Sequence, residues 1–419
     1  MIIFMCQRHI GRFCYGSGPW NDRYGKTSIK IDASNKVAGS EGMVYGDNVS
    51  FDGRCIVTYK TKEENKKALI AMSGGVDSSL AAKLMIDQDY DCIGCTMKLY
   101  HNEDIGIERS RTCCSLDDVE DARSVAYKLG MPFYVFNFTD AFRDTVIRKF
   151  IESYEKGITP NPCIDCNRYM KFDKLYERAR ILGCNYIVTG HYVRIEEKDG
   201  KFVLKKALDE TKDQSYVLYS MTQEQLTHTK FPLGGLRKTE VRRIAEQNGF
   251  INADKPDSQD ICFVPNGDYA QVIELQTGRK SVPGNFVDQQ GHILGRHKGV
   301  IHYTIGQRKG LGISNPEPLY VCAICPECGD VVLGSNDDLF RNETDVTDFH
   351  WISGNAPQGE FRCKAKIRYR QPEQWATVVP VGISAVHIVF DKPQRAITPG
   401  QAAVLYDRDI VLGGGTIRG

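Results

Sequence analysis

The chain has 419 residues, enough for two or three domains, and its 41% hydrophobic and 26% charged residues are ordinary for a globular protein. The formal net charge is +1, so the overall charge does not indicate a nucleic-acid partner. A surface that binds nucleic acid would have to come from local basic clusters. No apolar run approaches transmembrane length, and the N-terminal MIIFMCQRHIGRF has too short an apolar core for a signal peptide. We therefore expect a cytoplasmic protein that does not contact a membrane, with fifteen cysteines that are reduced, catalytic or metal-bound.

Residues 1–65 are rich in glycine, asparagine, serine and charged residues and show no sustained hydrophobic periodicity. We expect them to form a poorly ordered or loosely attached N-terminal extension. Met43 is a candidate internal start, a hypothesis that mass spectrometry of the native N-terminus would test.

The stretch Lys66–Ser79, KKALIAMSGGVDSS, predicts a buried strand, a glycine loop and the start of a helix. The two glycines of Ser73–Gly75 let a ligand approach the backbone, and Asp77 and Ser78 offer helix-capping side chains. Free N–H groups and the helix dipole make such a loop an anion site, although a tight turn that binds nothing remains the alternative. SGGVDSS resembles the PP-loop of ATP pyrophosphatases, and it lacks the G-K-[ST] of a Walker A loop.

Apolar strands alternate with amphipathic helices after Lys66, which predicts an α/β domain with a doubly wound, mostly parallel sheet. The predicted strands are 68–72, 92–99, 133–138 and 186–189, and the predicted helices are 117–130, 141–156 and 171–182. Ligands of such sheets bind beyond the carboxyl ends of the strands, where the glycine loop, Met97, Gly190 and His191 fall.

The pattern changes after about residue 225. Residues 238–248 predict a short basic helix, and from about residue 298 strand signals dominate, separated by glycine, proline and Asn-Asp turns. This spacing predicts a small antiparallel barrel or sandwich at the C-terminus.

Two cysteines at C-x-x-C spacing, Cys163 and Cys166, lie in the stretch TPNPCIDCN. Pro160 and Pro162 favour an irregular loop there. The pair could be a redox couple, half of a metal site or a nucleophile with a helper, or else two buried structural thiols. Cys262, in KPDSQDICFVP, is by itself more typical of a buried core cysteine.

Other cysteines leave further alternatives open. Cys113 and Cys114 precede a predicted helix, where a thiolate would be stabilised, but packing residues fit equally well. CAICPECG, which carries Cys322, Cys325 and Cys328, looks like half of a zinc knuckle. Cys363 could supply the fourth ligand of such a site, but no second C-x-x-C follows.

Several motifs occur in one order: SGGVDSS, NPCIDCN, TGHY, TKDQSYVLY, DSQDICF, HYTIGQRKGLGI, IRYRQ, TPGQAAVLY and LGGG. Together they resemble the MnmA family of PP-loop tRNA thiolases, the tRNA-specific 2-thiouridylases, from about residue 66 to the end. The resemblance implies a PP-loop domain at 66–225, a small central domain at 226–297 and a C-terminal antiparallel β-barrel at 298–419.

The same resemblance implies an activity. These sulfurtransferases use ATP and Mg²⁺ to adenylate the C2 oxygen of the wobble uridine of certain tRNAs. Sulfur delivered as a persulfide by a donor protein then replaces that oxygen, and AMP and pyrophosphate are released.

The resemblance also assigns roles to residues. ATP would be held by Ala71, Met72, Ser73, Gly74, Gly75, Val76, Asp77 and Ser78, with Met97 and Gly190 at the adenosine. Cys262 would carry the persulfide, and Cys166 would release the sulfur and leave a Cys166–Cys262 disulfide. The target base would lie against Asn161, Pro162 and Cys163, and the tRNA against Lys212, Asp213, Gln214, Arg368 and Tyr369.

The residue at position 163 leaves the mechanism open. Part of the family has an acidic residue there, whereas this chain has Cys163, so Cys163, Cys166 and Cys262 could instead hold an iron–sulfur cluster. The basic cluster Arg362–Arg370 could hold a phosphate backbone in either case. A PP-loop amide ligase and a tRNA-binding module without catalysis are the competing classes.

Overall fold

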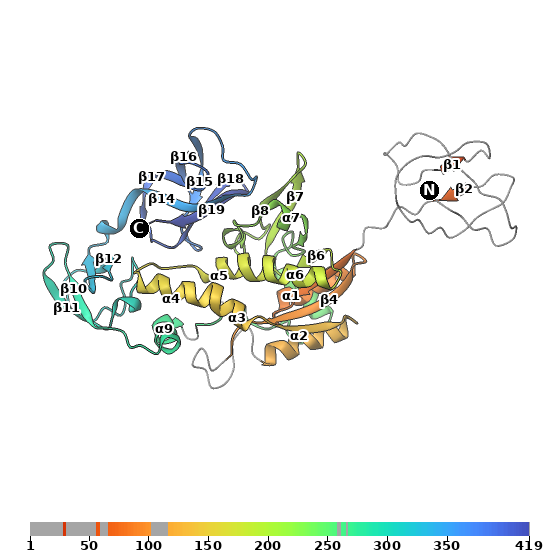
Figure 1. Ribbon diagram of the computed structural model, residues 1–419, viewed down its shortest axis with the longest axis horizontal. Helices are drawn as coiled ribbons and strands as arrows, with labels where there is room; N and C mark the ends of the chain where they lie inside the picture. Colours follow the sequence, from red (N-terminus) through yellow and green to blue (C-terminus); the bar gives the residue numbers. More distant parts are fainter. Residues whose placement is uncertain are drawn as a thin grey trace. The chain divides into compact units, whose positions relative to one another are not determined.

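The computed structural model describes residues 66–101, 116–257, 261–264 and 267–418, together with two short strands near the N-terminus (Figure 1). The chain divides into two compact units, Met1–Lys66 and Lys67–Gly419. In the first unit, β1 (Ser28–Lys30) pairs antiparallel with β2 (Ile56–Thr58). The expectations for the rest of residues 1–65, Met43 included, and for Cys113 and Cys114 concern positions outside the described residues.

The second unit begins with a five-stranded parallel sheet of order β5-β4-β3-β6-β9. From β3 the chain steps outward to β4 and β5, then returns to place β6 and β9 on the other side of β3. The strands are β3 (Lys67–Ala71), β4 (Asp91–Lys98), β5 (Phe133–Asn137), β6 (Tyr186–Val188) and β9 (Thr229–Lys230). The predicted doubly wound sheet is confirmed, and its topological switch point lies between β3 and β6.

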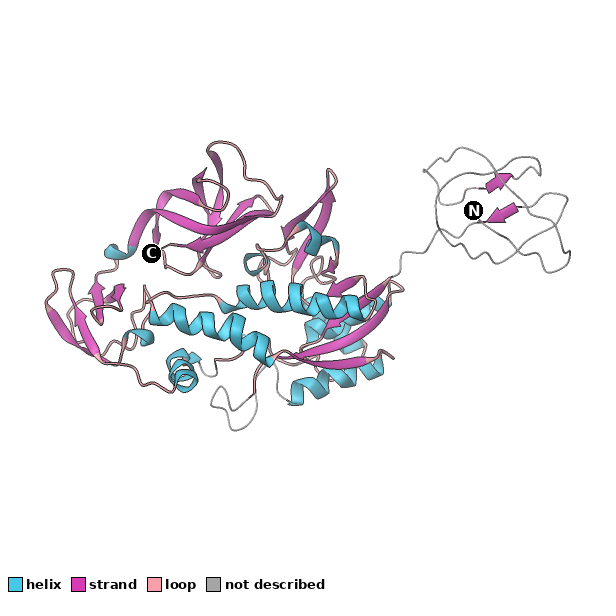
Figure 2. Ribbon diagram, viewed as in Figure 1, coloured by secondary structure: helices cyan, strands magenta, loops and turns pink. Residues whose placement is uncertain are grey.

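Helices cover both faces of this sheet, and alternate residues of β3 show which face each group covers (Figure 2). Ala68 and Ile70 pack in one core with α1 (Val76–Ile86), α2 (Leu116–Lys128) and α8 (Lys238–Gln247). Leu69 faces the other core, which is built on α3 (Thr139–Phe142), a π-helical stretch (Arg143–Ile147), α4 (Arg148–Glu155) and α6 (Leu175–Ile181). Burying both faces is what a parallel sheet requires.

A small second sheet of order β11-β10-β13-β12 follows α9 (Tyr269–Thr277). Its strands are β10 (Gly284–Val287), β11 (Ile293–His297), β12 (Tyr320–Cys325) and β13 (Asp330–Gly334). They close over their own apolar core of Phe286, Tyr303, Leu311, Val321, Val331 and Leu333.

The C-terminal strands form the expected antiparallel barrel. Their order is β14-β17-β16-β15-β18-β19, and β14 pairs with β19 to close the ring. The strands are β14 (Phe340–Trp351), β15 (Phe361–Lys366), β16 (Gln374–Pro380), β17 (Val386–Arg395), β18 (Ala402–Asp407) and β19 (Ile410–Ile417). A hairpin of β7 (Val193–Lys198) and β8 (Lys201–Lys206) joins β19 through the Ile410–Lys205 pair.

The sheets divide the chain differently from the expected boundaries at 225/226 and 297/298. β9 and α8 complete the first sheet and its helical cover, because β9 pairs with β6 and α8 packs on α1. β12 and β13, assigned by sequence to the barrel, belong to the small sheet, because β13 pairs with both β10 and β12. Among the described residues, no helix is long and apolar enough to span a membrane.

Candidate active site

The glycine loop after β3 is folded back onto the start of α1. Ser78 Oγ accepts a hydrogen bond from the Ser73 amide at 3.1 Å and donates one to the Gly75 carbonyl at 3.0 Å. Gly74 has φ +73°, and a Cβ there would lie 2.4 Å from the Asp118 carbonyl oxygen, so only glycine fits. The N–H groups of the first turn of α1 have no acceptor within the helix. The loop therefore has the shape and the donors of a phosphate cradle.

Gly190 follows β6 at the switch point and lies against this loop. A Cβ at Gly190 would lie 2.8 Å from both the Asp77 carbonyl carbon and the Ser78 amide nitrogen. Met97 stands near the end of β4, half-buried against the core that contains Leu69. The structure thus brings Gly190 to the predicted loop residues and places Met97 at the same edge of the sheet.

Asp77 does not cap α1, contrary to the expectation from sequence. The cap is Gly75, which has no side chain. The Asp77 carboxylate accepts hydrogen bonds from Lys238 Nζ at 2.8 Å to each oxygen and from Tyr192 Oη at 2.7 Å. Lys238 Nζ also pairs with Asp257 at 2.7 Å. Burial and the Asp77 charge raise the pKa of Tyr192, so its phenol stays protonated and donates to the carboxylate.

Asn252 and Lys255, which sequence reasoning missed, hold the other side of the loop. Asn252 Nδ2 donates to the Gly74 carbonyl and to Ser79 Oγ, both at 2.9 Å. Lys255 Nζ lies 2.6 Å from carboxylate oxygens of both Asp118 and Asp121 on α2. These residues lie in NADKP, a stretch with no motif that indicates the contacts.

The C-x-x-C pair begins a helix rather than lying in a loop. α5 (Pro162–Asp165) continues through a π-helical stretch (Cys166–Lys174) into α6. Asn161 Oδ1 accepts from the Cys163 amide at 3.2 Å, and Pro162 occupies the first helical position, where its missing N–H costs nothing. The prolines that suggested a loop therefore start the helix, with Cys163 exposed and Cys166 half-buried one turn later.

Lys171 joins the thiol-bearing helix to the end of β6. Because π-helical turns connect residues five apart, Lys171 follows Cys166 by one such turn. Lys171 Nζ lies 3.4 Å from His191 Nε2, and His191 Nδ1 lies 2.7 Å from Thr189 Oγ1. Burial, reinforced by the Lys171 charge, holds the pKa of His191 well below its usual range. Burial raises the pKa of Cys166, and the Lys171 charge opposes that rise.

Cys262 and Cys166 border the same apolar cluster, although they are far apart in sequence. That cluster contains Phe142, Phe150 and Phe263 on the α4 face of the sheet. The Cys262 carbonyl accepts a hydrogen bond from Tyr100 Oη at 2.7 Å, and both cysteines are partly exposed. The two thiols are thus brought to one side of the parallel sheet.

The residues expected to contact tRNA are each held by a neighbouring part of the chain. Lys212 Nζ pairs with Asp257 at 2.7 Å, and Gln214 Oε1 accepts from the Tyr192 amide at 2.9 Å. Tyr369 Oη donates to the Asp213 carbonyl at 3.4 Å. Burial, reinforced by the charge of Asp213, raises the pKa of Tyr369.

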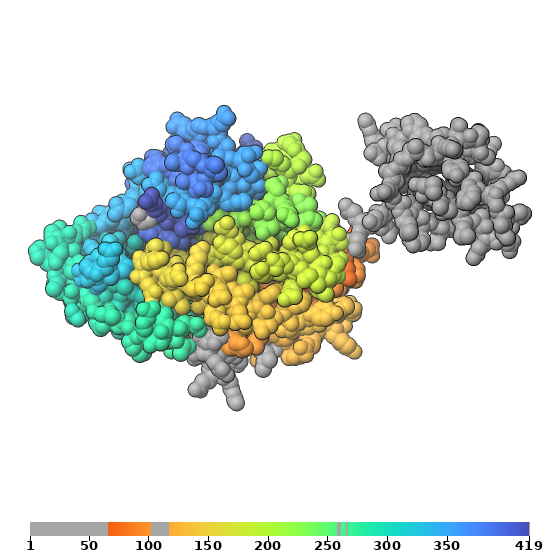
Figure 3. All heavy atoms as spheres, viewed as in Figure 1, coloured from red at the N-terminus to blue at the C-terminus, as the bar shows by residue number. Residues whose placement is uncertain are grey.

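Arg368 ties the segment after the small sheet's first hairpin to the barrel. Its guanidinium donates to the Ile305 carbonyl at 3.0 Å and to Thr398 Oγ1. The barrel also supports the thiol segment, because Gln401 Nε2 donates to the Thr159 carbonyl at 2.9 Å. Figure 3 shows the blue C-terminal strands lying against the yellow part of the chain. Asn161 and Pro162 follow directly on this supported backbone.

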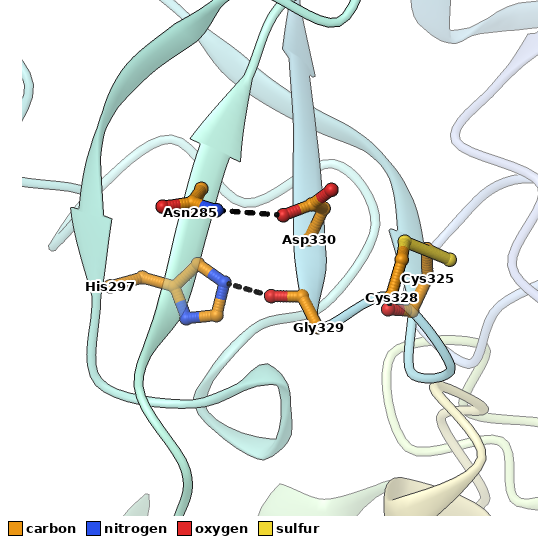
Figure 4. The surroundings of a disulfide bond; sticks show 6 residues. All are labelled: Asn285, His297, Cys325, Cys328, Gly329 and Asp330. Carbon is orange, nitrogen blue, oxygen red and sulfur yellow. Dashed lines mark hydrogen bonds between the residues drawn. A yellow bond between two sulfur atoms is a disulfide. The ribbon is translucent and has the colours of Figure 1, made fainter.

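The cysteines read as half of a zinc knuckle are arranged otherwise. Cys325 and Cys328 form a disulfide at the turn between β12 and β13 (Figure 4). Beside it, a His297 ring nitrogen lies 3.1 Å from the Gly329 carbonyl oxygen. Cys363 is buried in the barrel core. Within the described ranges, no three His, Cys, Asp or Glu side chains lie close enough together to hold a metal ion. Cys163, Cys166 and Cys262 therefore do not form such a group either.

A parallel sheet with a PP-loop at its switch point, two thiols on one face and a C-terminal barrel together define a PP-loop nucleotide-binding protein. Three family profiles match it: "tRNA methyl transferase HUP domain" at 66–266, "tRNA methyl transferase PRC-barrel domain" at 273–335 and "Aminomethyltransferase beta-barrel domain" at 341–417. The chain belongs to the tRNA-specific 2-thiouridylase (MnmA) family.

The chain matches several similar proteins over nearly their whole length. The tRNA-specific 2-thiouridylase MnmA of Clostridioides difficile is 51% identical over 355 residues, which cover 84% of this chain and 98% of that one. The protein of that name from Symbiobacterium thermophilum is 49% identical over 370 residues, 86% of this chain and 95% of that one. The one from Clostridium acetobutylicum is 49% identical over 354 residues, 84% and 100%.

Proposed function

We propose that this chain is an ATP-dependent tRNA uridine 2-sulfurtransferase that converts the wobble uridine to 2-thiouridine. The observation that carries the proposal is the phosphate cradle at the switch point together with two cysteines, Cys166 and Cys262, that border one apolar cluster on the same face of the sheet. Membership of the 2-thiouridylase family gives the substrate class. We infer a cytoplasmic location, because reduced thiols and a tRNA substrate are typical of that compartment.

The first step activates the base. The loop from Ala71 to Ser78 would hold the ATP phosphates, whose charge Mg²⁺ would help to neutralise, and Met97 and Gly190 would lie beside the adenosine. The C2 oxygen of the uridine attacks the α-phosphorus, and pyrophosphate leaves toward the N–H groups of α1. Lys238 and Tyr192 support this step, because they neutralise and hold the Asp77 carboxylate that would otherwise repel the phosphates.

The second step transfers sulfur. A donor protein loads Cys262 with a persulfide, whose terminal sulfur attacks C2 and displaces AMP. The Cys166 thiolate then attacks the Cys262 sulfur, so the bond to the transferred sulfur breaks and a Cys166–Cys262 disulfide forms. A thiol reductant returns both cysteines to the free form with two electrons.

The tRNA reaches the thiols with its wobble base turned out of the stack, which costs a few kcal/mol. Asn161, Pro162 and Cys163 lie against that base. The tRNA path is lined by Lys212, Asp213, Gln214, Arg368 and Tyr369. Contacts with Asp257, the Ile305 carbonyl and the Asp213 carbonyl hold Lys212, Arg368 and Tyr369 in place for the RNA.

One experiment tests the function as a whole. The chain is incubated with ATP, Mg²⁺, a persulfide source and unmodified tRNA, and the nucleosides are analysed by mass spectrometry. We expect 2-thiouridine with matching AMP. AMP without any thiouridine, in an enzyme that does not need Cys166, would instead favour a PP-loop ligase.

A cluster-based route is the second candidate, because the chain has Cys163 where part of the family has an acidic residue. It would require Cys163, Cys166 and Cys262 to gather around iron. Iron and sulfide assays on anaerobically purified protein separate the two routes, since an iron-free enzyme with full activity excludes the cluster.

A further inference from the structure

The Asp257 carboxylate lies between two lysines that belong to different parts of the candidate site. Lys212, a residue expected to contact tRNA, has its Nζ 2.7 Å from Asp257 Oδ2. Lys238, which holds Asp77 of the nucleotide loop, has its Nζ 2.7 Å from Asp257 Oδ1. Negative and positive side chains therefore alternate from the nucleotide loop to the expected tRNA path. We call these four residues the charge chain: Asp77, Lys238, Asp257 and Lys212.

The backbone of both lysines is anchored on one residue, Asp209. The Lys212 amide donates to the Asp209 carbonyl at 3.0 Å. The Lys238 amide donates to a carboxylate oxygen of Asp209 at 2.9 Å. One residue thus sets the starting points of two side chains that converge on Asp257. Because a lysine ammonium stands on a flexible aliphatic stem, it can exchange one anion for another while its backbone stays in place.

The two ends of the charge chain differ in their access to solvent. The Lys212 side chain is 36% exposed, whereas that of Lys238 is 10% exposed. An RNA phosphate can therefore reach Lys212 from outside, while Lys238 stays within the site. Lys238 Nζ lies within 2.8 Å of three carboxylate oxygens, two from Asp77 and one from Asp257, so both acids share its single charge.

Both cations act strongly on Asp257. Burial alone would raise the pKa of this carboxyl, but the bonds from Lys212 and Lys238 outweigh burial and lower it. An RNA phosphate that draws Lys212 away therefore leaves Asp257 with less positive charge around it. The Asp257 charge then acts more fully on Lys238, because charges this close are screened little in a partly buried site. Lys238 neutralises Asp77 less completely, and the Asp77 charge opposes the ATP phosphates.

We propose that Asp257 is a positioning residue that couples the tRNA contact at Lys212 to the nucleotide loop through Lys238. Occupation of either site weakens binding at the other, since coupling between two binding sites is reciprocal. ATP that binds after AMP and pyrophosphate have left thus loosens the hold on the thiolated tRNA and speeds its release. The identity of the two ligands rests on the proposed function, while the coupling rests on the charge chain itself.

The test measures the Kd of α,β-methylene-ATP, whose α–β linkage cannot be cleaved, with and without saturating unmodified tRNA. The ratio of the Kd with tRNA to the Kd without it reports the coupling. We expect this ratio to be about fivefold larger in the parent protein than in Asp257→Asn. Without tRNA, Asp257→Asn should bind the analogue about threefold more tightly, because Lys238 then serves Asp77 alone. A variant that is merely destabilised would bind the analogue more weakly.

Further variants locate the coupling within the charge chain. Lys212→Met should give the small ratio of Asp257→Asn, and the double variant should lower the ratio no further. Asp257→Glu keeps the charge and should restore part of the parent ratio. Arg242→Met is the matched control, because Arg242 also contacts Asp257, at 3.4 Å, but is not part of the charge chain. It should keep the parent ratio.

The other outcomes overturn the proposal. A ratio in Asp257→Asn equal to that of the parent protein removes the coupling. Weaker analogue binding by the same factor with and without tRNA, together with a lower melting temperature, makes Asp257 a structural residue only. Loss of the parent ratio in Arg242→Met would mean that any lost contact with Asp257 has the same effect.

Nucleoside mass spectrometry of the parent protein separates this proposal from the proposed function. If 2-thiouridine forms but the ratio does not depend on Asp257, the coupling fails and the proposed function stands. If the ratio depends on Asp257 but no 2-thiouridine forms, the coupling stands and the proposed function fails.

Discussion

The nucleotide loop and the thiol-bearing segments are held in place in opposite ways. Side chains from distant elements fix the loop: Tyr192 and Lys238 hold Asp77, and Asn252 holds Gly74. The thiol segment is instead held through its backbone, because Asn161 Oδ1 accepts from the Cys163 amide and Gln401 Nε2 donates to the Thr159 carbonyl. The Cys163 side chain is exposed, and Cys166 sits half-buried on a π-helical stretch. A site that binds ATP gains from a rigid cradle, whereas sulfur transfer requires two thiols that approach, bond and separate.

The sharpest way to separate the two regions is to remove one thiol. Cys166→Ala should lower 2-thiouridine formation about a thousandfold or more, because no thiolate remains to release the sulfur. AMP formation in the presence of tRNA should persist, since the loop is intact. Nucleoside mass spectrometry and AMP release measure the two steps.

Cys322→Ser is the matched control for that variant, because Cys322 is another half-buried thiol whose pKa burial raises. It should keep both steps. A Cys166→Ala enzyme that loses AMP formation as strongly as thiolation would show that the two regions are not separable.

The nucleotide loop should respond in the reverse order. Lys238→Met leaves Asp77 without its ion pair and should lower AMP formation about a hundredfold, or about 2.7 kcal/mol, mainly through a higher KM for ATP. The free energy of unfolding should fall by about 2 kcal/mol, less than for a fully buried pair because Asp77 is partly exposed.

Arg242→Met serves as the control for Lys238→Met, since Arg242 also lies on α8 and contacts Asp257 but not Asp77. Lys238→Arg should recover part of the activity. If Lys238→Met lowers the stability but leaves the KM for ATP unchanged, Lys238 has only a structural role.

A smaller effect is expected from Asn252, which makes two neutral hydrogen bonds to the loop region. Asn252→Ala should slow AMP formation about tenfold and destabilise the fold by about 1–2 kcal/mol, because a buried carbonyl loses its donor. Asn248→Ala is the comparison, since Asn248 bonds only within α8. Equal effects of both variants on AMP formation would contradict a role in shaping the loop.

The contrast between the two regions also explains what the sequence could predict. Features formed by neighbouring residues can be predicted. The apolar run before Ser73, the glycine loop and the alternation of strands and helices indicate the sheet and its switch point. The sequence does not indicate contacts between residues that are far apart along the chain. It therefore predicts neither the Lys238–Asp77 pair nor the contact of Asn252 with Gly74. β9 is only two residues long and has no recognisable strand pattern. The expected domain boundary at 225/226 therefore falls before β9 instead of after it.

Local signals also misled where one pattern fits two structures. Two prolines around Asn161 suggested a loop, but Pro162 is also suited to the first turn of a helix. C-x-x-C spacing at Cys325 and Cys328 fits half of a zinc site or a disulfide, and only the fold of the β12–β13 turn separates them. Spacing alone leaves both choices open because it specifies no partner.

The smallest expected effect tests how the two regions meet, at Lys171. Burial raises the pKa of Cys166 and the Lys171 charge opposes that rise, so Lys171→Met should move the pKa higher still. Alkylation of Cys166 by iodoacetamide, followed by peptide mass spectrometry, should then rise at higher pH than in the parent protein. Lys171→Arg keeps the charge and should restore the parent profile, while AMP formation stays within a few fold in both variants. A pH profile that is unchanged in Lys171→Met would mean that Lys171 serves only its contact with His191, and that the thiol is activated by the arriving tRNA or persulfide instead.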